Sequence, residues 1–210
     1  MRGTWQPSRQ LRAALVVSLG LVTAISGSLA HAGSQNAIGN AIDIGREVQQ
    51  ARQITRKFER DLRLELTRAL KTRGLVAAIG AYHAAAPEIA SRESEESGFE
   101  VRRIALKLRN PENAAVGWER KSLQTFITKR KQGADPKQLE QYELVRAKGG
   151  DRRFRYMKAI VVNNSCLGCH GPDLKDDVTS EIAKYYHDDK SKGFRRGDII
   201  GAYSLVKVIE

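Results

Sequence analysis

The chain has 210 residues and a formal net charge of +12. Its basic residues are scattered rather than clustered and form no nucleic-acid-binding motif, so we expect no nucleic-acid partner. Acidic redox proteins, or an anionic membrane surface, are better partners for a basic surface of this kind.

Residues 1–32 have the pattern of an export signal. Three arginines precede a nearly uncharged apolar stretch, which ends in the small residues of Ala30-His31-Ala32. This pattern predicts a signal peptide that is cleaved after Ala32, which leaves residues 33–210 as a single periplasmic domain. The alternative is an uncleaved membrane anchor, since the apolar stretch is nearly long enough to span a bilayer. The mature chain would carry 33 basic and 24 acidic residues, a charge of +9, and would be large enough to bury a core and a flat cofactor.

Two helices are predicted in the first half of the domain. Apolar residues recur at steps of three, four or seven over 41–73, which predicts one long helix that stops at Gly74. A second helix is expected over 75–86, and Pro87 then kinks or ends it. The polar, acidic segment 91–98 is expected to form a loop.

The remainder of the chain mixes shorter elements. Helices come first and strands mostly later, which predicts an α+β domain rather than a helical bundle. The composition predicts, in chain order, a strand over 99–108, a turn over 109–113, a helix over 117–131, a β-rich segment over 152–162, a short helix over about 178–187 capped by Asp176 or Asp177, and a terminal strand after Gly197.

The segment NNSCLGCHGPD contains both cysteines of the chain, Cys166 and Cys169, and His170 directly follows the second. This is the spacing of c-type haem attachment. Two thiols three residues apart on a helical turn reach the two vinyl groups of a haem, and the next residue presents an imidazole to the iron. The motif therefore predicts one covalent haem c with His170 as its proximal ligand.

Three other chemistries can use such a cysteine pair. A structural zinc site needs four protein ligands, and the mature chain offers few further candidates. A thioredoxin-like redox pair belongs to a βαβ setting, which the pattern does not predict. A plain structural disulfide in the periplasm remains an alternative.

The second axial ligand of the iron must come from elsewhere in the chain. His/Met cytochromes usually take a methionine after the motif, whereas Met157 precedes it. His187 lies at the polar end of the short helix, where an exposed histidine is the simpler interpretation. His83 lies on the apolar side of its helix among small residues. A histidine there is more often a core residue than a ligand, but an iron that needs a partner favours His83.

Four stretches resemble, in order, the PAS-like c-type haem domain family, whose members are sensor domains of bacterial receptors and stand-alone cytochromes. The similarity runs from about residue 45 to 208, and its stretches are GLVAAIGAYHAAAPEIA, VRRIALKLRNPENAAVGWE, CLGCHG and GFRRGDIIGAYSL. It implies a PAS-like antiparallel sheet with flanking helices, a long N-terminal helix and one covalently bound haem.

The resemblance also implies roles for pocket residues. Arg103, Arg109, Asn110 and Asn113 match the family's pattern, which places them along the haem pocket or at the haem propionates, where guanidinium groups suit carboxylates. The simpler interpretation of the two asparagines is that they build a turn.

The distal position of the family is often a cysteine, whereas His83 occupies it in this chain. A neutral imidazole favours ferric iron less than a thiolate does, so the resemblance implies a higher reduction potential than in thiolate-ligated relatives. The expected centre is a low-spin haem with His170 and His83 as its two ligands.

Two classes of function follow from this centre. The first is one-electron transfer by a periplasmic monohaem cytochrome, and the second is sensing of redox state or of NO or CO through a separate partner. Catalysis of the peroxidase type needs an open iron and distal acid–base groups, so we expect a carrier or a sensor rather than an enzyme. The long N-terminal helix suits a dimer as well as it suits packing on its own domain, so the oligomeric state stays open.

Overall fold

The structure is a computed structural model that describes residues 43–147 and 149–209. These residues fall within one unit, Ile42–Glu210. The predicted signal peptide, residues 1–32, lies outside the described part of the chain. Within that part, no helix is both long enough and apolar enough to cross a membrane.

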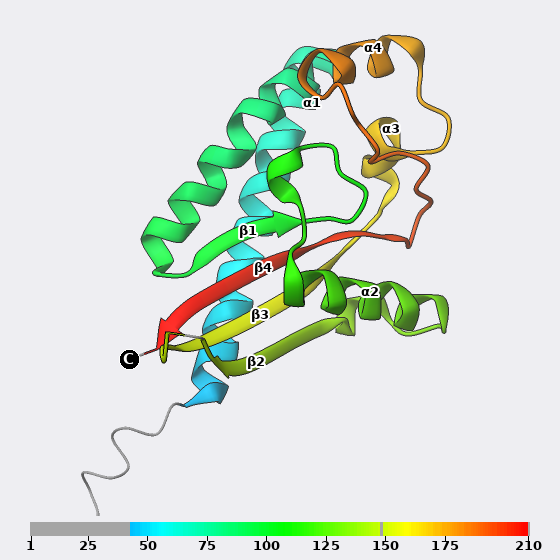
Figure 1. Ribbon diagram of the computed structural model, residues 1–210. Helices are drawn as coiled ribbons and strands as arrows, with labels where there is room; N and C mark the ends of the chain where they lie inside the picture. The colour runs from blue at the N-terminus through cyan, green and yellow to red at the C-terminus, as the bar shows by residue number, and fades with distance from the viewer. Residues whose placement is uncertain (1–42, 148, 210) are drawn as a thin grey trace, which may run out of the picture. The chain divides into compact units, whose positions relative to one another are not determined.

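Four antiparallel strands form one sheet in the order β1-β4-β3-β2 (Figure 1). The last strand of the chain therefore lies between the first and the third, and Leu205 is opposite both Val101 and Tyr156. Together with the helices, this confirms the predicted α+β class. The strands are β1 Glu100–Ile104, β2 Glu140–Arg146, β3 Arg152–Val161 and β4 Ile199–Ile209.

The long N-terminal helix α1 spans Ile44–Ser97 and is broken at Gly74. Gly74 has φ 76° and ψ 174°, a backbone conformation that glycine adopts without the steric cost of a Cβ atom. The chain reverses direction there, so that the second half of α1 returns toward β1 (Figure 1). Lys57 of the first half contacts Glu93 of the second, which shows that the two halves lie side by side. The break at Gly74 confirms the sequence prediction.

The predicted loop over 91–98 was wrong, because α1 continues to Ser97. Glu93 in this segment is buried and paired with Lys57, an interaction that compensates its charge inside the fold. The Ser94 hydroxyl accepts a 3.0 Å hydrogen bond from the backbone N–H of Val101 and so ties the end of the helix to β1. Pro87 lies inside the helix and is exposed, and it does not end the helix.

The shorter helices largely follow the sequence pattern. Helix α2, Gly117–Lys131, has the predicted bounds. Helix α4, Asp176–Tyr185, is present, but its N-cap is Lys175 rather than either aspartate. Strand β1 ends earlier than predicted, and β2 was not predicted. A 3₁₀ turn, Asn164–Cys166, leads into the short helix α3, Leu167–His170.

The sheet is buried on both faces. Tyr156 and Leu205 face α1 in a cluster that includes Phe58, Phe99 and Phe154. Met157, the residue after Tyr156 on β3, faces α2 and packs in the second cluster with Ile104, Leu123 and Phe126. Met157 is thus fully buried in the core.

A third, smaller cluster joins α1 to α3 and α4, which lie together at one end of the molecule (Figure 1). Val178 and Ile182 of α4 are almost fully buried against Ile79 of α1. Cys169 and Tyr186 pack at the edge of the same cluster. This contact sets the position of α1 relative to the cysteine motif.

Candidate functional site

A cavity of about 830 Å³ is lined by both halves of α1, by the sheet and by the cysteine motif. Its volume falls in the range of pockets that bind cofactors and other small molecules. Much of its wall is aliphatic, which suits a flat apolar ring; this part includes Leu62, Leu66, Leu70, Leu75, Ile79 and Ala86.

Cys166 and Cys169 are free thiols, and both line this cavity. Cys166 ends a 3₁₀ turn and Cys169 lies on α3, so one helical turn carries both side chains. The Asn163 carboxamide starts the turn by accepting a hydrogen bond from the backbone N–H of Ser165 at 2.9 Å. Burial raises the pKa of the Cys169 thiol, and the nearby Arg109 opposes this effect.

His170 also lines the cavity, and its tautomer is fixed by its surroundings. Its Nδ1 atom lies 2.7 Å from the backbone carbonyl oxygen of Ser191. A carbonyl can only accept, so Nδ1 carries the proton and Nε2 keeps its lone pair, which the Nη1 atom of Arg109 approaches at 3.5 Å. Burial, and then the charge of Arg109, lowers the pKa of His170 to about 4. The imidazole is therefore neutral at pH 7, as a metal ligand must be.

Arg109 connects the cysteine motif to the loop that holds His170. Its guanidinium group pairs with Asp189 through two hydrogen bonds of 3.1 Å, and both side chains are mostly buried. The same group donates to the backbone carbonyl oxygens of Cys169 and Ser191. Arg109 lines the cavity, but most of its donors serve these protein acceptors.

The other three residues implied by the resemblance also line the cavity. Arg103 donates to the Tyr82 hydroxyl at 2.9 Å. The Asn110 side chain accepts from the backbone N–H of Glu112, and the Asn113 carbonyl accepts from Ala105. Both asparagines therefore build the turn while they form part of the cavity wall.

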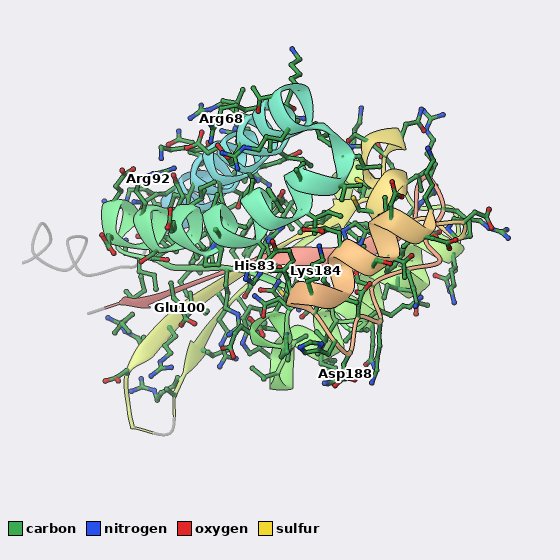
Figure 2. All side chains as sticks on the ribbon, turned by 90° about the horizontal axis from the view of Figure 1, so that it is seen from above. Arg68, His83, Arg92, Glu100, Lys184 and Asp188 are labelled. Carbon is green, nitrogen blue, oxygen red and sulfur yellow. The ribbon has the colours of Figure 1, made fainter. Side chains whose placement is uncertain are left out.

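His83 lies on the same cavity, on the second half of α1. Its Nδ1 atom is 2.8 Å from the Tyr186 hydroxyl, and its ring contacts the rings of both Tyr185 and Tyr186 at centroid distances of 4.9 and 5.0 Å. Figure 2 shows His83 next to α4, which carries Lys184. His187, in contrast, is exposed and is not part of the cavity wall.

Basic side chains dominate the charge of the cavity wall. Seven basic and two acidic residues line it, which favours a ligand with negative groups such as the two propionates of haem. The basic residues are Arg63, Arg102, Arg103, Lys107, Arg109, Lys137 and Lys158, and the acidic ones are Glu59 and Glu112.

The donor set fits a haem better than a bare metal ion. Among the described residues, no three His, Cys, Asp or Glu side chains gather in a way that could hold a metal ion. Two free thiols and a neutral imidazole on one turn, facing a large apolar cavity, suit a cofactor that supplies its own ring of nitrogen ligands. His83 on the same cavity offers one further imidazole.

Sequence reasoning missed four residues of this site. Tyr185 and Tyr186 reach His83 only because α4 packs on α1, and Asp189 acts through Arg109. Ser191 contributes a backbone carbonyl, which leaves no signal in the residue type. A pair of adjacent tyrosines next to a predicted helix end was the one visible hint.

Comparisons with known proteins place the chain in a family. No curated protein matches it. The crystal structure of the cyanobacterial heme-protein Tll0287 is similar in fold, with a TM-score of 0.57 and 24% identity over 81% of this chain and 98% of that chain. The family match confirms the resemblance inferred from the sequence. The chain belongs to the Tll0287-like family, whose sequence model matches residues 33–207.

Proposed function

We propose that the protein is a monohaem c-type cytochrome that transfers single electrons. Cys166 and Cys169 would hold the haem, and His170 and His83 would ligate its iron. The observation that carries this proposal is one helical turn with two free thiols and a neutral imidazole, facing a cavity that His83 also lines. The similar fold of the cyanobacterial heme-protein Tll0287 supports haem as the cofactor.

Each thiol would add across one haem vinyl group, forming a carbon–sulfur bond while the thiol proton goes to the vinyl group. When bound, the haem supplies one electron reversibly at its iron. A centre with two histidine ligands suits this exchange, because no ligand has to leave. The Ser191 carbonyl would hold the proton of His170 on Nδ1 and so leave the lone pair of Nε2 for the iron, and the aliphatic wall would limit the access of water.

We further infer that the fold is PAS-like and that the protein works in the periplasm. The first inference is supported by an antiparallel sheet in which the last strand lies beside the first, with a long helix on one face. The second is supported by the predicted signal peptide, residues 1–32, since bacterial haem c is attached outside the cytoplasm. The basic charge favours an acidic redox partner or an anionic membrane surface.

Sensing of redox state or of NO or CO is a second candidate, and the surroundings of His83 favour it. His83 lies between the break at Gly74 and β1, and it is hydrogen-bonded to a residue that follows α4. Replacement of His83 by a gas would therefore change contacts of both α1 and α4. A separate partner could respond to such a change.

Addition of CO to the reduced, haem-loaded protein distinguishes the two candidates. An electron carrier should show a reversible redox titration and no fast binding of CO. Rapid CO binding that displaces His83 would favour sensing. Loss of all haem on denaturation would contradict covalent attachment and overturn the proposed cytochrome.

A further inference from the structure

We infer that Tyr186 is a positioning residue for His83: its hydroxyl oxygen accepts the Nδ1 proton and so directs Nε2 toward the haem. The inference deepens the proposed function and rests on it, because it requires His83 to be an iron ligand. It adds a residue that the sequence pattern did not indicate.

The geometry limits the rotation of the His83 ring. The Tyr186 hydroxyl is 2.8 Å from Nδ1, and the Tyr186 ring meets the imidazole nearly edge-on, at an interplanar angle of 80°. Tyr185 lies against the imidazole at 32°. His83 is thus held by one hydrogen bond and two aromatic contacts, so its orientation depends on the place of α4.

The packing of α4 fixes Tyr186 in turn. The backbone N–H of Tyr186 donates to the carbonyl of Ile182 at 2.9 Å, and Ile182 is almost fully buried next to Ile79, one turn before His83. A Cβ atom on Gly80 would lie 2.3 Å from the Tyr185 hydroxyl oxygen, so glycine permits this close approach. The position of the Tyr186 hydroxyl is therefore set by the packing of α4 on α1.

One short segment, 186–191, contacts both histidines. Tyr186 begins it and bonds His83, while Ser191 ends it and bonds His170 through its carbonyl oxygen. Asp189 anchors its middle to Arg109 (Figure 2 marks this segment at Asp188). The two axial ligands are thus oriented from the same stretch of chain, one by a side chain and one by the backbone.

The proton arrangement determines what Tyr186 can do. A histidine that ligates iron through Nε2 keeps a proton on Nδ1, so the phenol oxygen must accept it. Such a hydrogen bond orients the ring and makes the imidazole a stronger donor to the metal. A stronger donor favours ferric iron and slows the release of His83. Removal of the hydroxyl should reverse both effects.

The test compares Tyr186→Phe with Tyr185→Phe in the haem-loaded protein. Both variants remove one hydroxyl from a ring that contacts His83, but only the first removes the hydrogen bond. In Tyr186→Phe we expect the rate of CO binding to ferrous iron to rise by about tenfold or more. The potential should become more positive, by about 59 mV for each tenfold loss of preference for ferric iron. Tyr185→Phe should stay close to the unmodified protein in both measurements.

Two failures can be told apart with His83→Ala as the third variant. If Tyr186→Phe keeps the potential and CO rate of the unmodified protein while His83→Ala changes the spectrum, the role of Tyr186 is overturned and His83 remains a ligand. If His83→Ala leaves the spectrum unchanged, the proposed ligation itself is wrong. Equal changes in Tyr186→Phe and Tyr185→Phe would indicate ring packing alone and would also overturn the inference.

Discussion

The Nδ1 atom of His170 lies 2.7 Å from the carbonyl oxygen of Ser191, on a loop that Arg109 holds through Asp189. The orientation of His170, the proposed proximal ligand, is therefore fixed by contacts within the protein fold. This preorganisation has consequences for stability as well as for ligation.

The haem-free protein should lose stability in mild acid through His170. Its pKa is about 4 in the fold against 6.5 for the free group, so the unfolded chain takes up a proton first as the pH falls. Above pH 6.5 His170 is neutral in both states and does not lower the free energy of unfolding. As the pH falls to about 4, its protonation in the unfolded chain lowers the free energy of unfolding by about 3 kcal/mol. Urea unfolding of the Cys166→Ala/Cys169→Ala variant across this range measures the effect. Adding His170→Gln should remove this part of the pH dependence, and an unchanged dependence would contradict the assignment.

The two cysteines should each contribute one bond to the haem. Mass spectrometry of the denatured protein should find one haem on the unmodified chain, because thioether bonds survive unfolding. Cys166→Ser and Cys169→Ser should each retain haem through the remaining bond, and the double variant should release it. Ser165→Ala, a neighbouring change that leaves both thiols, serves as the control. A denatured chain that carries no haem would argue against covalent attachment.

Arg109 should matter to stability more than a surface arginine does. Arg109→Ala leaves Asp189 buried without its partner, and breaking such a pair costs about 3 kcal/mol or more. Arg109→Lys should cost less, because it keeps the charge but loses the fork that contacts two oxygens. Urea unfolding compares both with Arg195→Ala, an exposed position where a change within about 0.5 kcal/mol is expected. An equal effect at both positions would show that the ion pair contributes little.

Glu119 should be a second buried polar anchor, between α2 and the centre of the sheet. Its carboxylate accepts from the Ser204 hydroxyl at 2.6 Å and from the backbone N–H of Val116 at 3.1 Å, and the residue is 3% exposed. Glu119→Ala leaves these donors buried without an acceptor, which should lower the free energy of unfolding by about 3 kcal/mol. The exposed Glu112→Ala is the matched control. Comparable unfolding curves for the two variants would contradict this role.

Sequence periodicity predicted those elements that have one clearly apolar, buried face and one polar, exposed face. In α2, Leu123 and Phe126 share the buried side, so the helix was found with its correct bounds. The loop prediction for segment 91–98 was wrong because the burial of Glu93 depends on its partner Lys57, which lies 36 residues earlier in the chain. Strand β2 was missed because it is an edge strand with half-buried residues and charged ends at Glu140 and Arg146.

The site was predictable to the extent that residue types carry its chemistry. Cys166, Cys169 and His170 were identified by their spacing, and the resemblance indicated Arg109. Tyr186 and Ser191 could not be found in this way, because one acts only after α4 packs on α1 and the other acts through its backbone. The residue types of the proposed ligands could thus be identified from the sequence, whereas their orientation arises from tertiary packing.

The visible absorption spectrum of the haem-loaded protein beside those of His83→Ala and His187→Ala tests the central claim most directly. The unmodified protein should be low-spin and six-coordinate, and His83→Ala should change to an open or water-ligated iron. His187→Ala should match the unmodified protein, since His187 is exposed and lies off the cavity wall. An unchanged low-spin spectrum in His83→Ala would contradict ligation of the haem iron by His83.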